Sequence, residues 1–215
     1  MCGSKGKSGV RRLLSSLLCL PMLLLYVNCM SSKSGEAIKR HSTQKEQYAK
    51  KTVAVLPVME QWESNKASTD STIPLRNGIS ENLDIKIKSG LPNSTIITSN
   101  KSYKILKENG KIKLLDEVGK TYANTGDIDD KEIVALSNIL KCDYLVFSRI
   151  KMVKGDAILA KVTGITLEVF MIGKNEKEVV WGGTGTYKKG GILGFGGTES
   201  GAVAEELVNL TFNSF

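Results

Sequence analysis

Apolar residues along the chain form runs and alternations that predict β-strands. Residues 52–58 (TVAVLPV) and 143–150 (DYLVFSRI) are apolar runs, and residues 94–98 (STIIT) form a shorter one. Such runs are typical of strands buried on both faces of a sheet. Apolar and polar positions alternate in residues 158–172, and residues 178–187 return after the turn GKNEK, which predicts a long antiparallel hairpin. The pattern therefore predicts a mixed sheet of about five strands.

Between the strands, apolar residues at steps of three and four predict helices that pack one face against the sheet. Asp129 and Glu132 resemble a helix cap with its carboxylates near the positive helix end. The predicted fold class is α/β (α+β): a mixed sheet with helices packed on it, a long hairpin near the C-terminus and a C-terminal helix. The predicted packing positions are Leu75, Ile79, Leu83, Ile87, Leu106, Ile112, Leu115, Val118, Tyr122, Ile133, Leu136, Leu140, Val203, Ala204, Leu207, Val208 and Thr211.

Glycines interrupt the return strand of the hairpin. Gly182, Gly183 and Gly185 indicate a bulge, a sheet edge or a close contact with another backbone. We expect the inward-facing side chains of this strand to be those of Val179, Trp181 and Tyr187. A second glycine-rich stretch, residues 190–197, precedes the last helix. Its backbone amides can hold an anion, but a flexible surface loop is the more common meaning of such a sequence.

The N-terminus combines a basic segment, an apolar run and a cysteine. Arg11 and Arg12 precede residues 13–27, and Cys29 follows them. The run is shorter than the roughly 20 apolar residues that span a bilayer, which indicates a bacterial lipoprotein export signal ending before a lipidated Cys29. Asn28 departs from the small residue that most lipoboxes place there, and the looser lipoboxes of spirochaetes are more similar. An uncleaved anchor and an ordinary secretory signal are the alternatives.

Residues 30–51 lack apolar periodicity and are rich in Ser, Lys, Gln and Glu, which predicts a flexible tether. A coil of this length spans roughly 25 Å on average. The one histidine of the chain, His41, falls in this segment and is expected to be a solvated linker residue. The expected organisation is therefore a signal peptide in residues 1–28, the lipidated cysteine and tether in residues 29–51, and one domain in residues 52–215.

The charge balance fits an exported protein. Removal of residues 1–28 leaves 26 of the 30 Lys+Arg against 22 Asp+Glu, a net charge of +4. This balance suits contact with anionic lipid, lipopolysaccharide or wall polymer. Binding of nucleic acid usually requires a concentrated basic stripe, which this sequence lacks. The candidate contacts to an anionic surface are Lys101, Lys104, Lys107, Lys111 and Lys113. An ordinary solvated helix face is the alternative interpretation of this run of lysines.

The residue types that most catalytic and metal sites need are missing from the domain. No histidine follows residue 51, which removes Ser-His-Asp and Cys-His catalysis and histidine metal sites. Residues 127–132 (DIDDKE) lack the spacing of a calcium loop, and residues 117–121 (EVGKT) lack the first glycine of a P-loop. Cys142 is the one cysteine expected to stay unmodified after export, which predicts a buried thiol and no disulfide framework. We expect no catalytic residue, metal, cofactor or small-molecule substrate.

Three segments carry a family resemblance: TVAVLPV at residues 52–58, LKCDYLVFSRI at residues 140–150 and EVVWGGTG at residues 178–185. With the helices between them and the final helix, residues 52–215 resemble the TolB N-terminal-domain superfamily. Its lipoprotein members include penicillin-binding-protein activators, curli secretion channel subunits and many spirochaete lipoproteins. The resemblance implies an α/β domain with a role in the cell envelope and points to no particular partner.

Together these features predict a non-enzymatic, lipid-anchored envelope protein that binds another protein or assembles with copies of itself. The expected location is the outer membrane, on its periplasmic face or at the cell surface, with anchoring in the inner membrane left open. The alternative is a subunit of a curli-type oligomeric export channel, which ranks lower because such a subunit needs two amphipathic membrane hairpins. The expected partner surface is an exposed edge of the hairpin, at Gly182, Gly183, Thr184, Gly185 and Tyr187.

The lipoprotein interpretation predicts that Cys29 is the group to which the lipid is joined. A Cys29→Ala variant is expected to lose labelling by radioactive palmitate. A Cys19→Ala variant, which changes the competing cysteine inside the apolar run, is expected to label as the wild type does. Retained labelling of the Cys29→Ala chain would contradict this interpretation.

Overall fold

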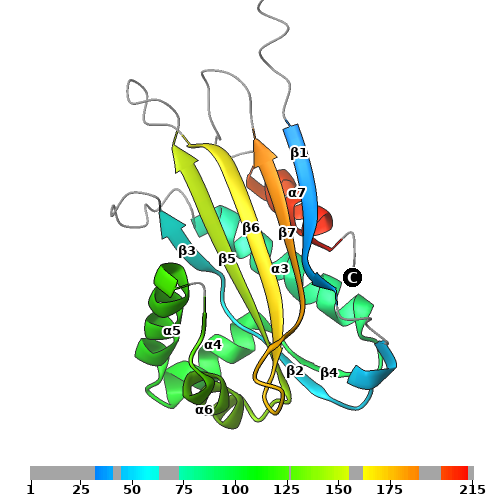
Figure 1. The fold of residues 1–215 in the computed structure, drawn as a ribbon, viewed down its shortest axis with the longest axis vertical. Helices are drawn as coiled ribbons and strands as arrows, with labels where there is room; N and C mark the ends of the chain where they lie inside the picture. The colour runs from blue at the N-terminus through cyan, green and yellow to red at the C-terminus, as the bar shows by residue number, and fades with distance from the viewer. Residues whose placement is uncertain are drawn as a thin grey trace, which may run out of the picture.

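A seven-stranded mixed sheet with the order β1-β7-β6-β5-β2-β4 runs through the molecule, and β3 pairs with β5 off this path (Figure 1). The computed structural model describes residues 32–40, 45–62, 73–125, 127–154, 162–188 and 200–212. β2 is parallel to β4 and β5, whereas β5, β6, β7 and β1 are antiparallel neighbours. The strands are β1 (Ser32–Arg40), β2 (Thr52–Val55), β3 (Met59–Trp62), β4 (Thr95–Ile97), β5 (Tyr144–Lys154), β6 (Val162–Gly173) and β7 (Val179–Lys188).

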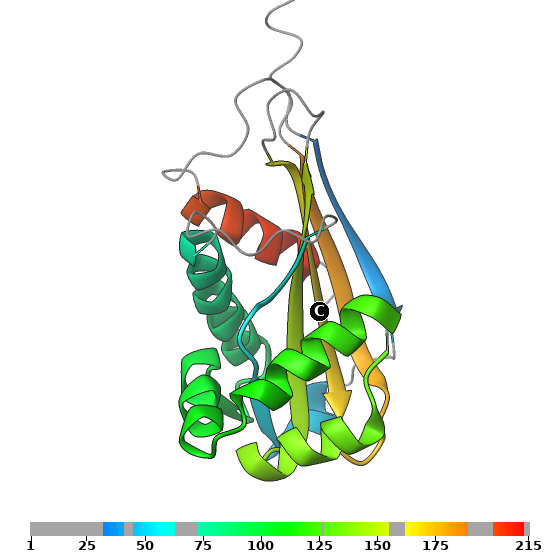
Figure 2. The ribbon, with the colours of Figure 1, turned by 90° about the vertical axis from the view of Figure 1, so that its left-hand side faces the viewer.

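Helices pack against both faces of this sheet, in two groups (Figure 2). One face is covered by α3 (Ile73–Gly90) and α7 (Ser200–Thr211), and we call it the α3–α7 face. The other is covered by α4 (Ser99–Glu108), α5 (Ile112–Thr125) and α6 (Asp130–Leu140), and we call it the α4–α6 face. This arrangement confirms the predicted α+β fold class with its hairpin β6–β7 and C-terminal helix; β1 and β3 are additional to the five predicted strands.

The buried helix positions agree with the apolar spacing of the sequence. α3 buries Leu75, Ile79, Leu83 and Ile87, which share one face at steps of four. At the start of α6, Asp129 is the N-cap and its Oδ1 accepts a hydrogen bond from the backbone N–H of Lys131 at 2.7 Å, as the capping pattern predicts. The buried residues of α7 are Val203, Ala204, Leu207, Val208 and Thr211.

β5 contributes to both cores because its side chains alternate between the two faces of the sheet. Tyr144, Val146 and Ile150 belong to the core beneath α3 and α7. Leu145 and Phe147 belong to the core beneath α4, α5 and α6, where Phe147 stacks on Phe170 of β6. A strand buried on both faces explains why the sequence of β5 is almost continuously apolar.

β2 and β3 lie one after the other along the same side of β5, with an irregularity between them at Pro57. Val55 pairs with Val146 and Met59 pairs with Arg149. The three residues between β2 and β3 therefore stand opposite only two residues of β5. Proline has no N–H to donate to the ladder, which is why strands break or bulge at such a residue. β3, at residues 59–62, has no counterpart among the strands predicted from the sequence.

The predicted tether is wrong for two stretches of residues 30–51. Residues 32–40 form β1, which pairs antiparallel with β7 from Ser32 opposite Lys188 to Arg40 opposite Trp181. The 3-10 helix η1 (Lys45–Tyr48) follows, and its Tyr48 is fully buried with its ring 5.0 Å from that of Tyr144. β1 escapes sequence analysis because a strand at a sheet edge is held by backbone hydrogen bonds and needs no apolar alternation.

The predicted exposed edge at β7 is also wrong, because β7 lies between β6 and β1. Of the three meanings of its glycines, close contact with another backbone applies. A Cβ atom at Gly185 would stand 2.6 Å from the carbonyl oxygen of Leu207 in α7, and one at Gly183 would overlap the carbonyl oxygen of Thr211. The glycines therefore let α7 lie directly on the strand.

Val179 does not share the face of Trp181. The register of β6 and β7 shifts between Met171 opposite Trp181 and Ile172 opposite Val179, which leaves Val180 as an extra residue. Val179 consequently packs against the core of the α4–α6 face, whereas Trp181 lies in the core of the α3–α7 face. A bulge of one residue reverses the alternation, which sequence parity cannot anticipate.

Several predicted features lie outside the residues that the structure describes. These are the signal peptide, Cys29, His41 and the glycine-rich residues 190–197. Within the described ranges, no helix is long and apolar enough to cross a membrane.

The close approach of α7 to β7 predicts a strong effect of a single methyl group. Gly183→Ala is expected to lower the free energy of unfolding by about 1–3 kcal/mol, because its Cβ overlaps the backbone of α7. The matched control is Gly201→Ala in α7, because no atom lies within 4 Å of the Cβ position of Gly201. Its free energy of unfolding should stay unchanged or rise by up to about 1 kcal/mol. Urea unfolding curves measure both, and equal stability of the two variants would contradict the described packing.

Candidate functional site

The α4–α6 face of the sheet is covered by helices over only part of its length. α5 crosses this face obliquely, and the part of the sheet nearest the start of β1 has no described helix in front of it (Figures 1 and 2). We call this part the open half-sheet. Four polar, half-buried side chains on it are those of Lys151, Thr166, Thr184 and Thr186, as is usual for an antiparallel sheet face that meets solvent.

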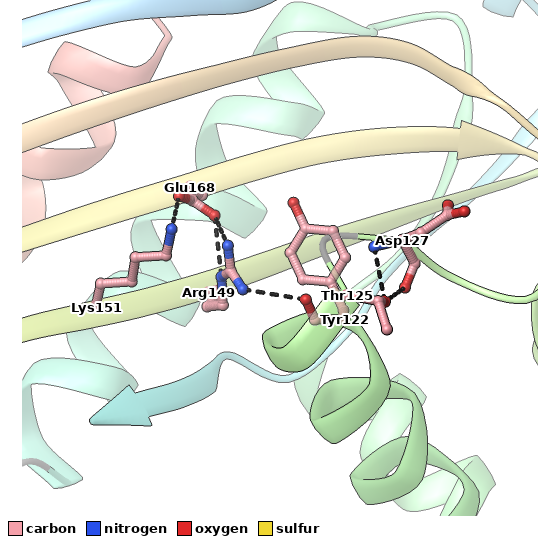
Figure 3. Close-up of polar contacts among 6 residues, drawn as sticks. All are labelled: Tyr122, Thr125, Asp127, Arg149, Lys151 and Glu168. Carbon is pink, nitrogen blue, oxygen red and sulfur yellow. Dashed lines mark hydrogen bonds and ion pairs between the residues drawn. The ribbon is translucent and has the colours of Figure 1, made fainter. Parts of the chain in front are cut away.

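A buried ion cluster lies where the helical layer ends (Figure 3). Arg149 of β5 stands directly opposite Glu168 of β6. The Nε of Arg149 donates to Oε2 of Glu168 at 2.9 Å, and its Nη2 donates to the same oxygen. Nζ of Lys151 lies 2.6 Å from Oε1 of Glu168. Arg149 and Glu168 are only 6% and 9% exposed, so two cations share one nearly buried carboxylate.

α5 closes over this cluster at its C-terminal end. The guanidinium carbon of Arg149 lies 4.3 Å from the centre of the Tyr122 ring, and Nη1 donates to the Tyr122 carbonyl oxygen at 3.4 Å. A cation is favoured here because the last carbonyls of a helix carry partial negative charge. Burial raises the pKa of the Tyr122 hydroxyl, and the charge of Arg149 acts in the opposite direction. The ring therefore stays neutral at physiological pH.

A second set of hydrogen bonds ends α5 at this place. Oγ1 of Thr125 donates to the carbonyl oxygen of Thr121 at 2.8 Å, and the backbone N–H of Asp127 donates to the same hydroxyl at 3.1 Å (Figure 3). The chain then turns towards α6. The C-terminal end of α5 is thus held in two ways: by the contacts of Tyr122 with Arg149 and by the hydrogen bonds of Thr125.

The cluster is suited to positioning and recognition. It joins β5, β6 and α5 and leaves the Lys151 side chain 38% exposed at the border of the open half-sheet. Across the next pair of strands, the hydroxyl groups of Thr166 and Thr186 lie 3.1 Å apart. In the described part of the chain, no three His, Cys, Asp or Glu side chains gather as metal ligands do.

The sequence analysis does not identify the ion cluster. Arg149 lies inside the apolar run of residues 143–150, and Glu168 lies inside the alternation of residues 158–172. Arg149 is a charged residue between apolar neighbours of a predicted buried strand, and this is the signal that marks it; Glu168 occupies a polar position of its alternation, where the pattern does not predict burial. Their pairing becomes visible only with the register of the two strands.

The structure disperses the predicted partner surface. Gly182, Gly183 and Gly185 are buried and pair with β1, and α7 lies against Gly183 and Gly185; half-buried Tyr187 packs against the core of the α3–α7 face. Only Thr184 belongs to the open half-sheet, where it stands opposite Glu168.

The five lysines predicted to contact an anionic surface are exposed, while that contact stays a prediction; the predicted burial of the thiol is confirmed. All five lysines, Lys101, Lys104, Lys107, Lys111 and Lys113, are exposed on α4 and at the start of α5. Cys142 is buried, and desolvation raises the pKa of its thiol to about 11. This thiol is therefore protonated and unreactive at physiological pH.

The fold and the site define an α+β domain with a mixed sheet, two helical layers and a partly open sheet face. Neither the protein-family models nor the curated proteins give a match to the chain. Among solved structures, the lipoprotein GNA1162 from Neisseria meningitidis is similar at 12% identity and a TM-score of 0.45, over 76% of this chain and 99% of that one. The PelC dodecamer from Paraburkholderia phytofirmans is similar at 12% identity and a TM-score of 0.41, over 83% and 92%.

The C-terminal domain of LpoB from Escherichia coli is a further similar structure, at 11% identity and a TM-score of 0.38, over 69% of this chain and 87% of that one. At these identities and TM-scores the likeness assigns neither a family nor a function. Membership of the TolB N-terminal-domain superfamily and a spirochaete origin stay predictions.

The ion cluster predicts a large cost when its anion is removed. Glu168→Ala leaves the buried guanidinium of Arg149 without a carboxylate and is expected to lower the free energy of unfolding by about 3–5 kcal/mol. Combining Glu168→Leu with Arg149→Met removes both charges and should restore part of this stability. The exposed pair of Lys104 and Glu108, 4.0 Å apart, supplies the control: Glu108→Ala should change stability little. Equal effects of Glu168→Ala and Glu108→Ala in urea unfolding would refute the structural role of the cluster.

Proposed function

We propose that the protein is a lipid-anchored, non-enzymatic component of the bacterial cell envelope that binds another protein or assembles with copies of itself. The export signal and Cys29 support the anchor. The lack of histidine after residue 51 supports a role without catalysis. The outer membrane is the proposed location, with anchoring in the inner membrane as the alternative.

The observation that carries the proposal is the position of β1. Its first residue, Ser32, stands three residues after Cys29, and three residues span at most about 10 Å. A lipid on Cys29 therefore holds the start of β1 close to the membrane surface, in place of the longer flexible tether that the sequence predicts. The open half-sheet lies at the same end of the molecule (Figure 1).

The proposed partner surface consists of the outer edge of β1 and the open half-sheet beside it. In the described chain β1 ends the strand order, so its outer backbone N–H and C=O groups are those that a further strand pairs with. Thr166, Thr184 and Thr186 provide hydroxyl groups on the adjoining face, and Lys151 provides a cation. A partner with an extended, polar or acidic segment fits this combination.

The export-channel alternative receives less support. A curli-type channel subunit needs two amphipathic hairpins that enter the membrane. The described hairpin β6–β7 is integrated in the sheet, with Trp181 in the core and α7 against Gly183 and Gly185. A ring of subunits in detergent extracts, seen by electron microscopy, would favour this alternative.

Photo-crosslinking in living cells tests the proposed partner surface. A photoreactive residue replaces Thr186 on the open half-sheet, and the matched control replaces Thr95, which is exposed on β4 at the opposite edge of the sheet. We expect discrete protein adducts from position 186 and none from position 95. A Thr184→Glu substitution, whose carboxylate repels an acidic partner segment, should reduce these adducts about tenfold, equivalent to about 1.4 kcal/mol of binding free energy.

Two results would contradict the proposal. One is the same adduct pattern from both positions. The other is an adduct yield from position 186 that Thr184→Glu leaves unchanged while thermal unfolding shows that the variant is folded.

A further inference from the structure

The positive charge of the mature chain is concentrated in one short stretch. Residues 99–113 contain five lysines and one acidic residue, Glu108, and thus carry a net charge of +4. This equals the net charge of all residues from 29 to 215, so the rest of the mature chain is neutral on balance. The excess charge is a local property of α4 and the start of α5.

The lysines of this stretch form an exposed row. Lys101, Lys104 and Lys107 recur every three residues along α4, which places successive side chains about 4.5 Å apart along the helix axis. Lys111 and Lys113 follow beyond the end of α4, the second of them in the first turn of α5. Of these five lysines, only Lys104 has an ion-pair partner among the described residues: Glu108, at 4.0 Å. The row is therefore available for charges that the domain does not supply.

An exposed aromatic ring lies within the same helix. Tyr103 is 43% exposed, and the other exposed large apolar residues of the described chain, Ile73 and Ile85, belong to α3. One ring among cations does not form the apolar centre that protein interfaces usually have. An aromatic ring can, however, pack against the apolar face of a sugar while neighbouring lysines pair with its acidic groups.

The row faces away from the proposed anchor. α4 lies towards the end of the molecule opposite the start of β1, as Figures 1 and 2 agree. With Cys29 within about 10 Å of Ser32, the anchoring bilayer lies at the other end. This separation, which rests on the proposed function, disfavours the headgroups of that bilayer as the anion.

From these observations we infer that the lysine row, with Tyr103, binds an anionic glycan polymer of the envelope, such as the acidic wall polymer. Binding uses several weak contacts at once: ammonium groups pair with carboxylates spaced along the polymer, and the Tyr103 ring packs on a sugar. Such binding weakens with added salt because surface charges are screened. The protein then connects the membrane at one end to the polymer at the other.

The test uses the lipidated full-length protein in vesicles mixed with purified peptidoglycan sacculi. Wild-type vesicles are expected to sediment with the sacculi at low salt and to be released at high salt. The triple substitution Lys101→Ser, Lys104→Ser and Lys107→Ser should reduce this sedimentation at least tenfold, and Tyr103→Ala should reduce it less. The matched control replaces three exposed lysines of other elements with serine: Lys88, Lys131 and Lys188.

The outcomes separate the possible anions. Sedimentation that the triple substitution leaves unchanged, or that the control lowers equally, overturns the inference. The inference is also overturned if the protein captures fewer sacculi in anionic vesicles than in neutral vesicles and the triple substitution removes that difference. In that case the lysine row binds its own bilayer. A wrong assignment of the lipid anchor gives a different result. The Cys29→Ala chain would then associate with vesicles as the wild type does, whatever amount of sacculi sediments.

Discussion

Pairing along β5 is the interaction on which the rest of the structure depends. β5 joins the parallel part of the sheet, through β2 and β3, to the antiparallel part, through β6. Its alternating side chains contribute to both cores, so each helical layer is positioned against the same strand. Where the apolar alternation gives way to Arg149, the helical layer of the α4–α6 face ends as well. The ion cluster with Glu168 and Tyr122 therefore marks the border between a covered and an open sheet face.

Sequence periodicity predicts the elements whose burial is regular. α3, α6 and α7 bury the positions that their apolar spacing indicates. The apolar runs also predict where β2, β4, β5, β6 and β7 lie along the chain. The failures have local causes. β1 is polar and β3 follows a proline, so neither has the pattern of a buried strand, and the extra residue Val180 reverses the parity of β7. The candidate site depends on long-range register, which periodicity does not contain.

The correction at β1 changes the functional interpretation most. The predicted tether would leave the domain free to turn beneath the proposed anchor, whereas a strand three residues after a lipidated Cys29 would restrict its orientation. The two ends of the molecule also differ in chemistry. The end near the start of β1 presents the outer edge of the described strand order and threonine hydroxyl groups, and the far end presents the lysines of α4. A protein partner near the membrane and an anionic polymer beyond it fit this division.

A distance-dependent relaxation measurement can determine the proposed orientation of the domain on a membrane. Spin labels are placed by Ser32→Cys at the start of β1 or by Lys104→Cys on α4, in the lipidated protein; buried Cys142 does not compete for the label. Vesicles containing a nickel-chelating lipid then relax labels near the bilayer. We expect strong relaxation of the label at position 32 and little at position 104. Equal relaxation at both positions, or stronger relaxation at position 104, would contradict it.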